Sequence, residues 1–164
     1  MPVIHEGDPM PSWSELLRFE TIRGAGGTSR PLPASEFQQK LVVVSGRVRL
    51  GDAETAELAG GAVFDLERRG AEPVTFVETS VVVWLSGAWS EHTGRSGVFT
   101  PHDIASPVEG DPADYPKETA FDNHFHDCDE HWIIVEGTGT VVTEGTPYEV
   151  RPGDCVSTRT GYLR

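Results

Sequence analysis

The stretch NHFHDCDEHWIIVEG, residues 123–137, carries the strongest structural signal in this chain. His124 and His126 are two residues apart, so in an extended strand both imidazoles project from one face. After a bend expected at 127–129, Glu130 begins an apolar strand. Two neutral imidazoles and a carboxylate that converge on one pocket suit divalent iron, manganese, zinc, nickel or cobalt. We therefore predict a metal site with the ligands His124, His126 and Glu130.

The alternation of side chains along a strand also assigns the neighbours of Glu130. Glu130 and Trp132 share one face, whereas His131 and Ile133 share the other. This parity predicts that His131 is not a ligand. It also places Trp132 on the inner face, where we interpret it as a core residue rather than as a platform for substrate.

A second stretch resembles the first at a nearly constant offset. VVVSG at 42–46 matches IIVEG at 133–137, and Gly61 matches Gly153, which gives offsets of 91 and 92 residues. Two glycine landmarks at one spacing indicate an internal duplication. In the first copy, Gln39 occupies the position of Glu130, and Ser35 and Pro33 occupy the two histidine positions. The first copy is therefore predicted to hold no metal.

The rest of the chain is typical of an all-β protein. Its 18 glycines and 12 prolines separate short segments rich in β-branched residues. The predicted strands are Leu41 to Leu50, Ala62 to Leu66, Val74 to Glu78 and Ser80 to Ser86. A capping box of Ser12 and Glu15 predicts one helical turn over Trp13 to Arg18. A glycine-rich loop is expected at 24–27.

The pattern His-x-His-x3-Glu-x6-Gly, here His124, His126, Glu130 and Gly137, resembles the first conserved motif of the cupin superfamily. The resemblance implies an all-β, double-stranded β-helix (jelly-roll) barrel with little helix, into which these ligands point. The two repeats would make the chain bicupin-like, with the metal motif in the second repeat and a degenerate first repeat.

The chain departs from the cupin pattern at several positions. Glu118 stands where the first motif usually has glycine. The second motif begins at Gly153 and includes Gly161, but Arg159 replaces its proline and Arg164 its histidine. Arginine stays protonated and cannot bind a metal, so three ligands are expected rather than four.

The second repeat also looks cut short by about 15 residues, or one or two strands. We predict a degenerate cupin-like repeat over 1–90, a connector over 91–117 and an incomplete metal-motif repeat over 118–164.

The resemblance implies a metal-binding protein, and we predict a metal-dependent enzyme that acts on a small metabolite. Oxygenase, isomerase, decarboxylase and epimerase reactions all occur among cupins, and no residue here chooses between them. A non-catalytic cupin that binds a small ligand, and a purely structural one, are the alternatives.

Other candidate residues have simpler interpretations. Cys128 and Cys155 are interpreted as two small buried side chains, with soft ligands or a disulfide as the alternatives. His102 is the best substitute for the missing ligand, because the connector could reach the barrel mouth. Asp127 and Asp129 could act as an acid or base, although acids at a bend are usually solvated.

The net charge of −13 argues against nucleic acid and anionic membranes as partners. The first residues lack the basic and then apolar order of a signal peptide, and no apolar run approaches a membrane span, so a cytoplasmic location is expected. Unpaired strand edges in an incomplete barrel would need cover. We therefore predict a homodimer.

Overall fold

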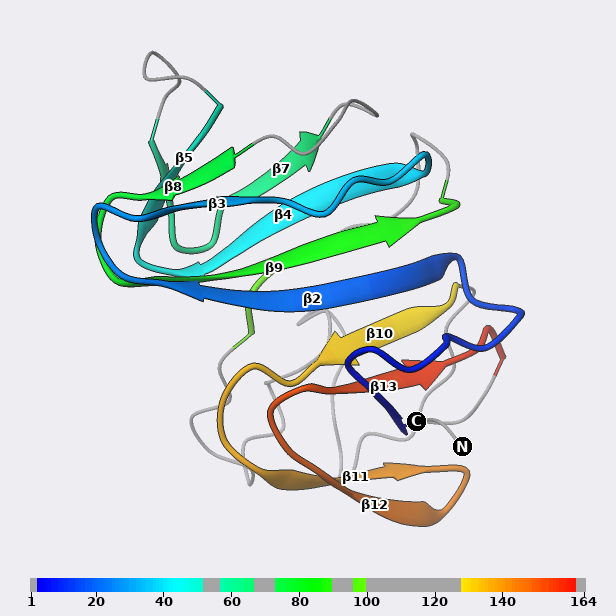
Figure 1. The fold of residues 1–164 in the computed structure, drawn as a ribbon. Coiled ribbons are helices and arrows are strands. Elements are labelled where there is room, and N and C mark those ends of the chain that lie inside the picture. Colours follow the sequence, from blue (N-terminus) through cyan, green and yellow to red (C-terminus); the bar gives the residue numbers. More distant parts are fainter. Residues whose placement is uncertain (1–2, 52–56, 67–72, 90–95, 100–127, 162–164) are drawn as a thin grey trace, which may run out of the picture. The chain divides into compact units, whose positions relative to one another are not determined.

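The computed structural model describes residues 3–51, 57–66, 73–89, 96–99 and 128–161, and all regular elements in these ranges are strands (Figure 1). This confirms the prediction of an all-β protein. The chain forms two compact units, Ile4–Val98 and Phe99–Arg164 with Met1–Val3. The described part contains no helix long and apolar enough to cross a membrane. The division into 1–90, 91–117 and 118–164 stays a prediction, because most of the connector lies outside the described residues.

The larger unit, Ile4–Val98, contains two four-stranded antiparallel sheets, as expected for a jelly roll (Figure 1). The first has the order β2-β9-β4-β7, with bounds Leu16–Gly24, Ser80–Gly87, Gln38–Ser45 and Val63–Leu66. The second has the order β3-β8-β5-β6, with bounds Ser29–Pro31, Pro73–Phe76, Arg47–Leu50 and Leu58–Ala59.

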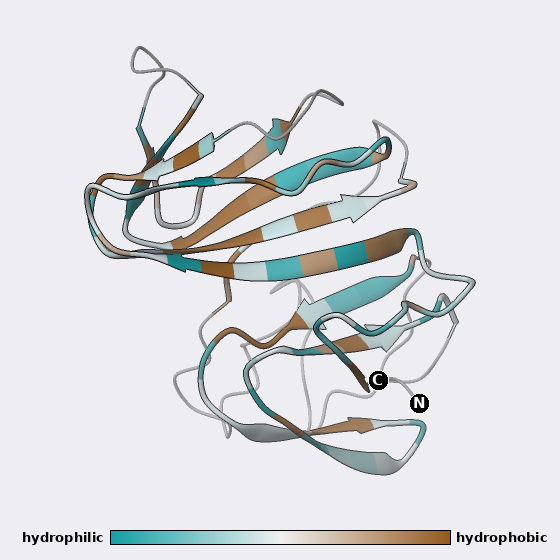
Figure 2. Ribbon diagram, viewed as in Figure 1, coloured by the Kyte–Doolittle hydropathy of each residue, from teal (hydrophilic) through white to brown (hydrophobic). Residues whose placement is uncertain are grey.

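The core of the larger unit lies between these sheets and follows from strand alternation. Along β2, where hydrophobic and polar bands follow one another (Figure 2), Ile22 is buried in this core and the adjacent Arg23 is exposed. Both sheets contribute to one apolar cluster, whose largest fully buried members are Trp84 and Phe76. Burying such side chains contributes about 1.5–3 kcal/mol each relative to exposure.

The predicted helical turn over Trp13 to Arg18 is wrong, because β2 begins at Leu16. β2 is antiparallel to β9 along its whole length, with an irregularity between Leu16 and Arg18. A continuous ladder satisfies many more backbone groups than one capped turn. Ser14 instead donates its hydroxyl to the carbonyl of Leu16, at 2.7 Å.

The predicted strand from Leu41 to Leu50 is two strands, β4 and β5, which belong to different sheets. Gly46 separates them with a φ of 79°, a left-handed conformation that glycine adopts without strain. The other predicted strands of this unit are confirmed to within two residues as β7, β8 and β9.

The smaller unit contains β10 (Glu130–Ile133) and β13 (Asp154–Thr158), which pair antiparallel. β1 is Val3–His5, at the boundary between the two units in the chain. A separate hairpin joins β11 (Gly139–Thr143) to β12 (Thr146–Val150) through Glu144 and Gly145, at φ values of 48° and 72°. Two successive positive φ values are typical of the tight turns that match strand twist.

The duplication predicted from the sequence has a counterpart in backbone conformation. Gly46 and Gly137 have φ values of 79° and 78°, and Gly61 and Gly153 have values of 89° and 93°. The amide of Gly61 donates to the carbonyl of Val43 at 2.8 Å, and the amide of Gly153 donates to that of Ile134 at 3.0 Å. The two stretches therefore share local backbone structure as well as residue type.

Strand register repeats as well. Gln39 is opposite Leu66 in the pair β4–β7, and Glu130 is opposite Thr158 in the pair β10–β13. Residue 130 follows residue 39 by 91 positions, and residue 158 follows residue 66 by 92, the offsets of the two glycine landmarks. This correspondence allows the two units to be compared residue by residue at the candidate site.

Candidate metal centre

Glu130 lies on β10 and its face is defined by the register with β13. Directly opposite residues of an antiparallel pair project to the same side. One side therefore carries Glu130 and Trp132 with their partners Thr158 and Val156. The other carries His131 and Ile133 with their partners Ser157 and Cys155. The predicted separation of Glu130 from His131 is present in the structure.

His131 is held on the side away from Glu130. Its Nδ1 lies 2.9 Å from the hydroxyl of Ser157, and that hydroxyl lies 3.5 Å from the sulfur of Cys155. Ser157 and Cys155 are both buried. The contact links β10 to β13 one residue away from Glu130, which gives His131 a structural role.

Asp129 also has a structural role. One of its carboxylate oxygens, Oδ1, accepts from the amide of Thr160 at 2.9 Å and from its hydroxyl at 3.1 Å. Asp129 thus ties the start of β10 to the turn after β13. Asp127 and Asp129 are the two candidates for a catalytic acid or base. Asp129 stabilises the strand pair, and Asp127 lies outside the described residues.

The two cysteines differ from each other. Both are free thiols; Cys155 is buried, whereas Cys128 is exposed, so the expectation of two buried side chains is wrong for Cys128. Burial raises the pKa of Cys155 to about 11, and the hydrogen bond with Ser157 lowers it by less. A thiol that stays protonated at neutral pH is a poor metal ligand, and Cys155 faces away from Glu130.

Thr158 is the residue of the site that sequence reasoning missed. It is 5% exposed and directly opposite Glu130, and its hydroxyl has no hydrogen-bond partner among the described residues. An unpaired buried hydroxyl costs free energy. A carboxylate and an orphaned hydroxyl on one face fit a polar ligand or metal-bound group. The only signal in the sequence was the position of Thr158 five residues after Gly153.

Trp132, on the side of Glu130, is half-buried and packs edge-to-face against Phe99, with ring centroids 5.5 Å apart and planes at 77°. Phe99 is 44% exposed. The pair supplies an apolar surface next to the carboxylate, so the site combines charge with aromatic contact.

His124 and His126 lie outside the described residues, as do His102 and Arg164. Within the described ranges, no group of three or more His, Cys, Asp or Glu side chains is arranged to hold a metal. The ligand set of His124, His126 and Glu130 therefore stays a prediction, of which the structure describes the carboxylate.

In the larger unit, the equivalent position is closed by hydrogen bonds. Gln39 is 3% exposed; its Oε1 accepts from Nε1 of Trp84 at 2.9 Å and its Nε2 donates to the carbonyl of Ser35 at 3.2 Å. The hydroxyl of Ser35 bonds that of Ser86 at 2.6 Å. Neutral side chains that hydrogen-bond to one another therefore occupy the positions equivalent to Glu130 and His126.

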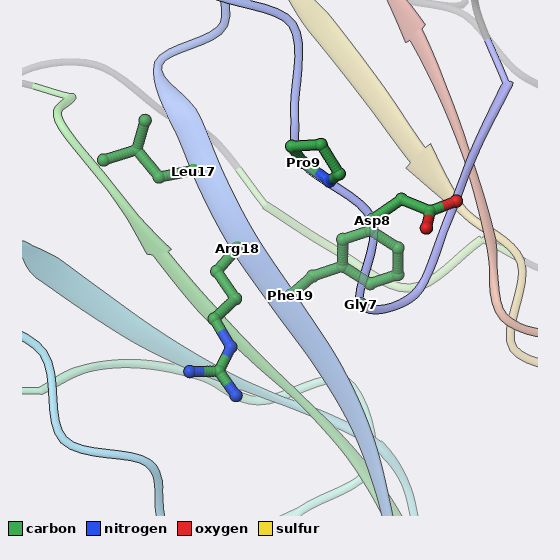
Figure 3. A pocket seen from close by; sticks show the side chains of 6 residues that line it. All are labelled: Gly7, Asp8, Pro9, Leu17, Arg18 and Phe19. Carbon is green, nitrogen blue, oxygen red and sulfur yellow. The ribbon is translucent and has the colours of Figure 1, made fainter.

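A hollow of about 260 Å³ lies elsewhere on the larger unit, beside β2 (Figure 3). Its lining residues are Gly7, Asp8, Pro9, Leu17, Arg18 and Phe19. Figure 3 shows the side chains of Asp8 and Arg18 pointing in different directions, with the ring of Phe19 between them. Because its charged groups do not converge, this hollow is not the candidate centre.

Comparison with known proteins identifies the family. A sequence model of the cupin domain matches residues 113–163, which include the metal motif. The chain belongs to the cupin superfamily. This cupin is also 38% identical, over 99% of its length and 76% of the relative's, to the uncharacterized protein y4oW of Sinorhizobium fredii.

Two solved structures share the fold of this cupin. Protein Ylba from E. coli is 12% identical, with a TM-score of 0.54 over 92% of this chain and 72% of Ylba. Oxalate decarboxylase from Bacillus subtilis, whose Mn(II) centers were studied, is 13% identical, with a TM-score of 0.51 over 92% of this chain and 65% of that enzyme. At these identities the likeness concerns the fold alone.

Proposed function

We propose that this cupin binds one divalent transition-metal ion through His124, His126 and Glu130 and acts as a metal-dependent enzyme on a small metabolite. The observation that carries the proposal is the orientation of Glu130. It shares its side of the strand pair with the unpaired hydroxyl of Thr158, whereas the neighbouring imidazole of His131 is bonded on the opposite side.

The donor set determines what the site could do. A bound divalent ion would supply Lewis-acid or oxygen-activating chemistry. Glu130 would provide the anionic donor and the two imidazoles the neutral ones, which suits iron, manganese, zinc, nickel or cobalt. The Mn(II) centers of the Bacillus subtilis enzyme make Mn²⁺ the first ion to test.

The partner is proposed to be a small molecule rather than a macromolecule. The net charge of −13 disfavours nucleic acid and anionic membrane surfaces. The aromatic pair of Trp132 and Phe99 adjoins the proposed ligand Glu130 and offers contact area for an apolar group. A cytoplasmic homodimer remains the proposed setting.

The larger unit is proposed to have a structural role. Its position equivalent to Glu130 holds Gln39, whose amide is bonded on both sides, in a closed and largely apolar core. The active metal is therefore expected to be confined to the smaller unit.

Metal analysis of the purified chain, followed by titration of metal-free protein with Mn²⁺ and Co²⁺, tests the proposal. Binding of one ion per chain is expected. The absence of saturable binding would refute it. Turnover assays with small carboxylates and aromatic metabolites under oxygen then separate an enzyme from a cupin that only binds its ligand.

A further inference from the structure

Thr158 is buried, lies opposite Glu130 and has a side-chain oxygen without a hydrogen-bond partner among the described residues. It is 5% exposed, and its Oγ1 is buried without a partner in the described part of the chain. Two other side-chain atoms in that part share the second property, Thr21 Oγ1 and Arg49 Nε. Both belong to half-buried residues of the larger unit. Thr158 alone of the three is opposite a residue of the metal motif.

The internal repeat shows what a purely structural residue looks like at this position. Leu66, opposite Gln39, is the equivalent of Thr158, and it is buried in the apolar core. There the polar group beside it, Gln39, has its partners, and the facing residue is apolar. In the smaller unit the facing residue brings a hydroxyl that packing does not require.

A hydroxyl in this situation lowers the stability of the empty protein. Valine has nearly the shape of threonine and would fill the same space without burying a polar atom. The free-energy cost of the unpaired hydroxyl disappears when a ligand supplies a hydrogen-bond acceptor. Binding residues that reduce stability in the absence of ligand are a common compromise in functional sites.

We infer that Thr158 is a ligand-binding residue whose hydroxyl donates a hydrogen bond to an oxygen of the small molecule held beside Glu130. The inference rests on the proposed function and narrows its substrate class. The proposed set of two neutral imidazoles, one carboxylate and a divalent ion would carry a single net positive charge. An anionic oxygen ligand balances that charge, and a hydrogen bond to such an oxygen is of the stronger, charge-assisted kind.

The same side of the strand pair defines the rest of the ligand. Val156 is buried and Trp132 is half-buried there, and Phe99 packs on Trp132. These side chains can contact a hydrocarbon or aromatic group but cannot accept a second charge. The ligand class is therefore a small monocarboxylate with an apolar end.

The test compares Thr158→Val and Thr158→Ser with the wild type in the full chain. Two quantities are measured: the melting temperature of the metal-free protein, and the affinity of the Co²⁺-loaded protein for acetate, followed by the visible absorption of Co²⁺. Thr21→Val is the matched control, because it removes an equally unpaired hydroxyl from the other unit.

Thr158→Val should raise the melting temperature by about 2–4 °C, as expected for loss of an unsatisfied buried hydroxyl. It should bind Co²⁺ as the wild type does but bind acetate about 10-fold or more weakly, because a hydrogen bond to a charged group is lost. Thr158→Ser should keep the acetate affinity to within about threefold. Thr21→Val should raise the melting temperature and leave acetate binding unchanged.

A lower melting temperature for Thr158→Val would show that the hydroxyl has a structural partner, and would overturn the inference whatever the metal does. Equal acetate affinities in Thr158→Val and the wild type would overturn it while leaving the proposed metal site intact. Wild-type protein that takes up no Co²⁺ would overturn the proposed function, and the inference with it.

Discussion

The indole N–H of Trp84 donates a 2.9 Å hydrogen bond to Oε1 of Gln39, and both side chains are almost completely buried. Gln39 stands at the repeat position of Glu130, the proposed metal ligand in the other unit. Its amide satisfies Trp84 and the carbonyl of Ser35. At this position a neutral amide links β4 to β9, whereas the equivalent residue of the other unit is an anionic side chain that is proposed to bind the metal.

Replacing Gln39 by alanine should destabilise the larger unit by about 3 kcal/mol. The change leaves the buried N–H of Trp84 without an acceptor, which costs about 1–3 kcal/mol, and it opens a small cavity. Denaturant unfolding followed by tryptophan fluorescence measures the loss.

Gln38→Ala is the matched control. Gln38 is half-buried and adjacent along β4, but projects to the opposite face of the strand. It should cost less than about 1 kcal/mol. Equal losses from both substitutions would show that the bond between Trp84 and Gln39 contributes nothing of its own.

His126→Ala should remove most of the bound metal, because it deletes one of three proposed ligands. His131→Ala should keep the metal and lower only the stability, by about 1 kcal/mol, since it loses one hydrogen bond to Ser157. Metal content by elemental analysis, together with thermal unfolding, distinguishes the two variants. Equal metal loss from both would mean that the parity argument for β10 is wrong.

The predictions that succeeded rest on local patterns. The strand that begins at Glu130 and the opposite faces of Glu130 and His131 follow from a period of two residues. The internal repeat stays a prediction, but Gly46 and Gly137, on which it rests, adopt the same left-handed φ values. These features depend on near neighbours in the chain, so the residues themselves indicate them.

Two of the failures depend on distant partners. The capping signal that predicts a helical turn over Trp13 to Arg18 is local, whereas the ladder between β2 and β9 joins residues as far apart in the chain as Phe19 and Leu85. Thr158 was missed because the hydrogen-bond partners of a hydroxyl depend on the groups that pack around it in the folded chain. The sequence of one strand alone does not predict how β10 packs against β13.

Alkaline pH should destabilise the protein through Cys155. Burial raises the pKa of this thiol from 9.0 to about 11. The unfolded chain therefore loses the proton first, and stability present below pH 9.0 is lost as the pH rises toward about 11. The slope for one such group is about 1.4 kcal/mol per pH unit, so the full effect is on the order of 2–3 kcal/mol.

Cys155→Ala isolates this contribution, because other groups also titrate in this range. The difference in unfolding free energy between about pH 8 and about pH 10.5 should be smaller in the variant by roughly 2 kcal/mol. Cys128→Ala, at the exposed cysteine, should behave like the wild type. A thiol reagent should modify Cys128 quickly and Cys155 only after unfolding. Rapid modification of both would contradict the burial of Cys155.

The edge of the first sheet supports the prediction of a homodimer. β7 is the last strand in the order β2-β9-β4-β7, and Val63 and Phe64 on it are 37% and 42% exposed. An edge strand that offers backbone donors beside exposed apolar side chains readily pairs with another chain. Two-fold pairing of β7 with β7 of a second chain would cover the edge strands of both chains. Two-fold dimers are the commonest closed assembly.

Light scattering at micromolar concentration should therefore give twice the chain mass of 17.9 kDa. Val63→Lys places a charge on the edge and should shift the protein toward the monomer. Val142→Lys is the control, because Val142 is equally exposed, at 38%, but lies on the hairpin of β11 and β12. Wild-type protein that scatters as a monomer would refute the dimer. A dimer that Val63→Lys leaves intact and Val142→Lys disrupts would move the interface to the hairpin.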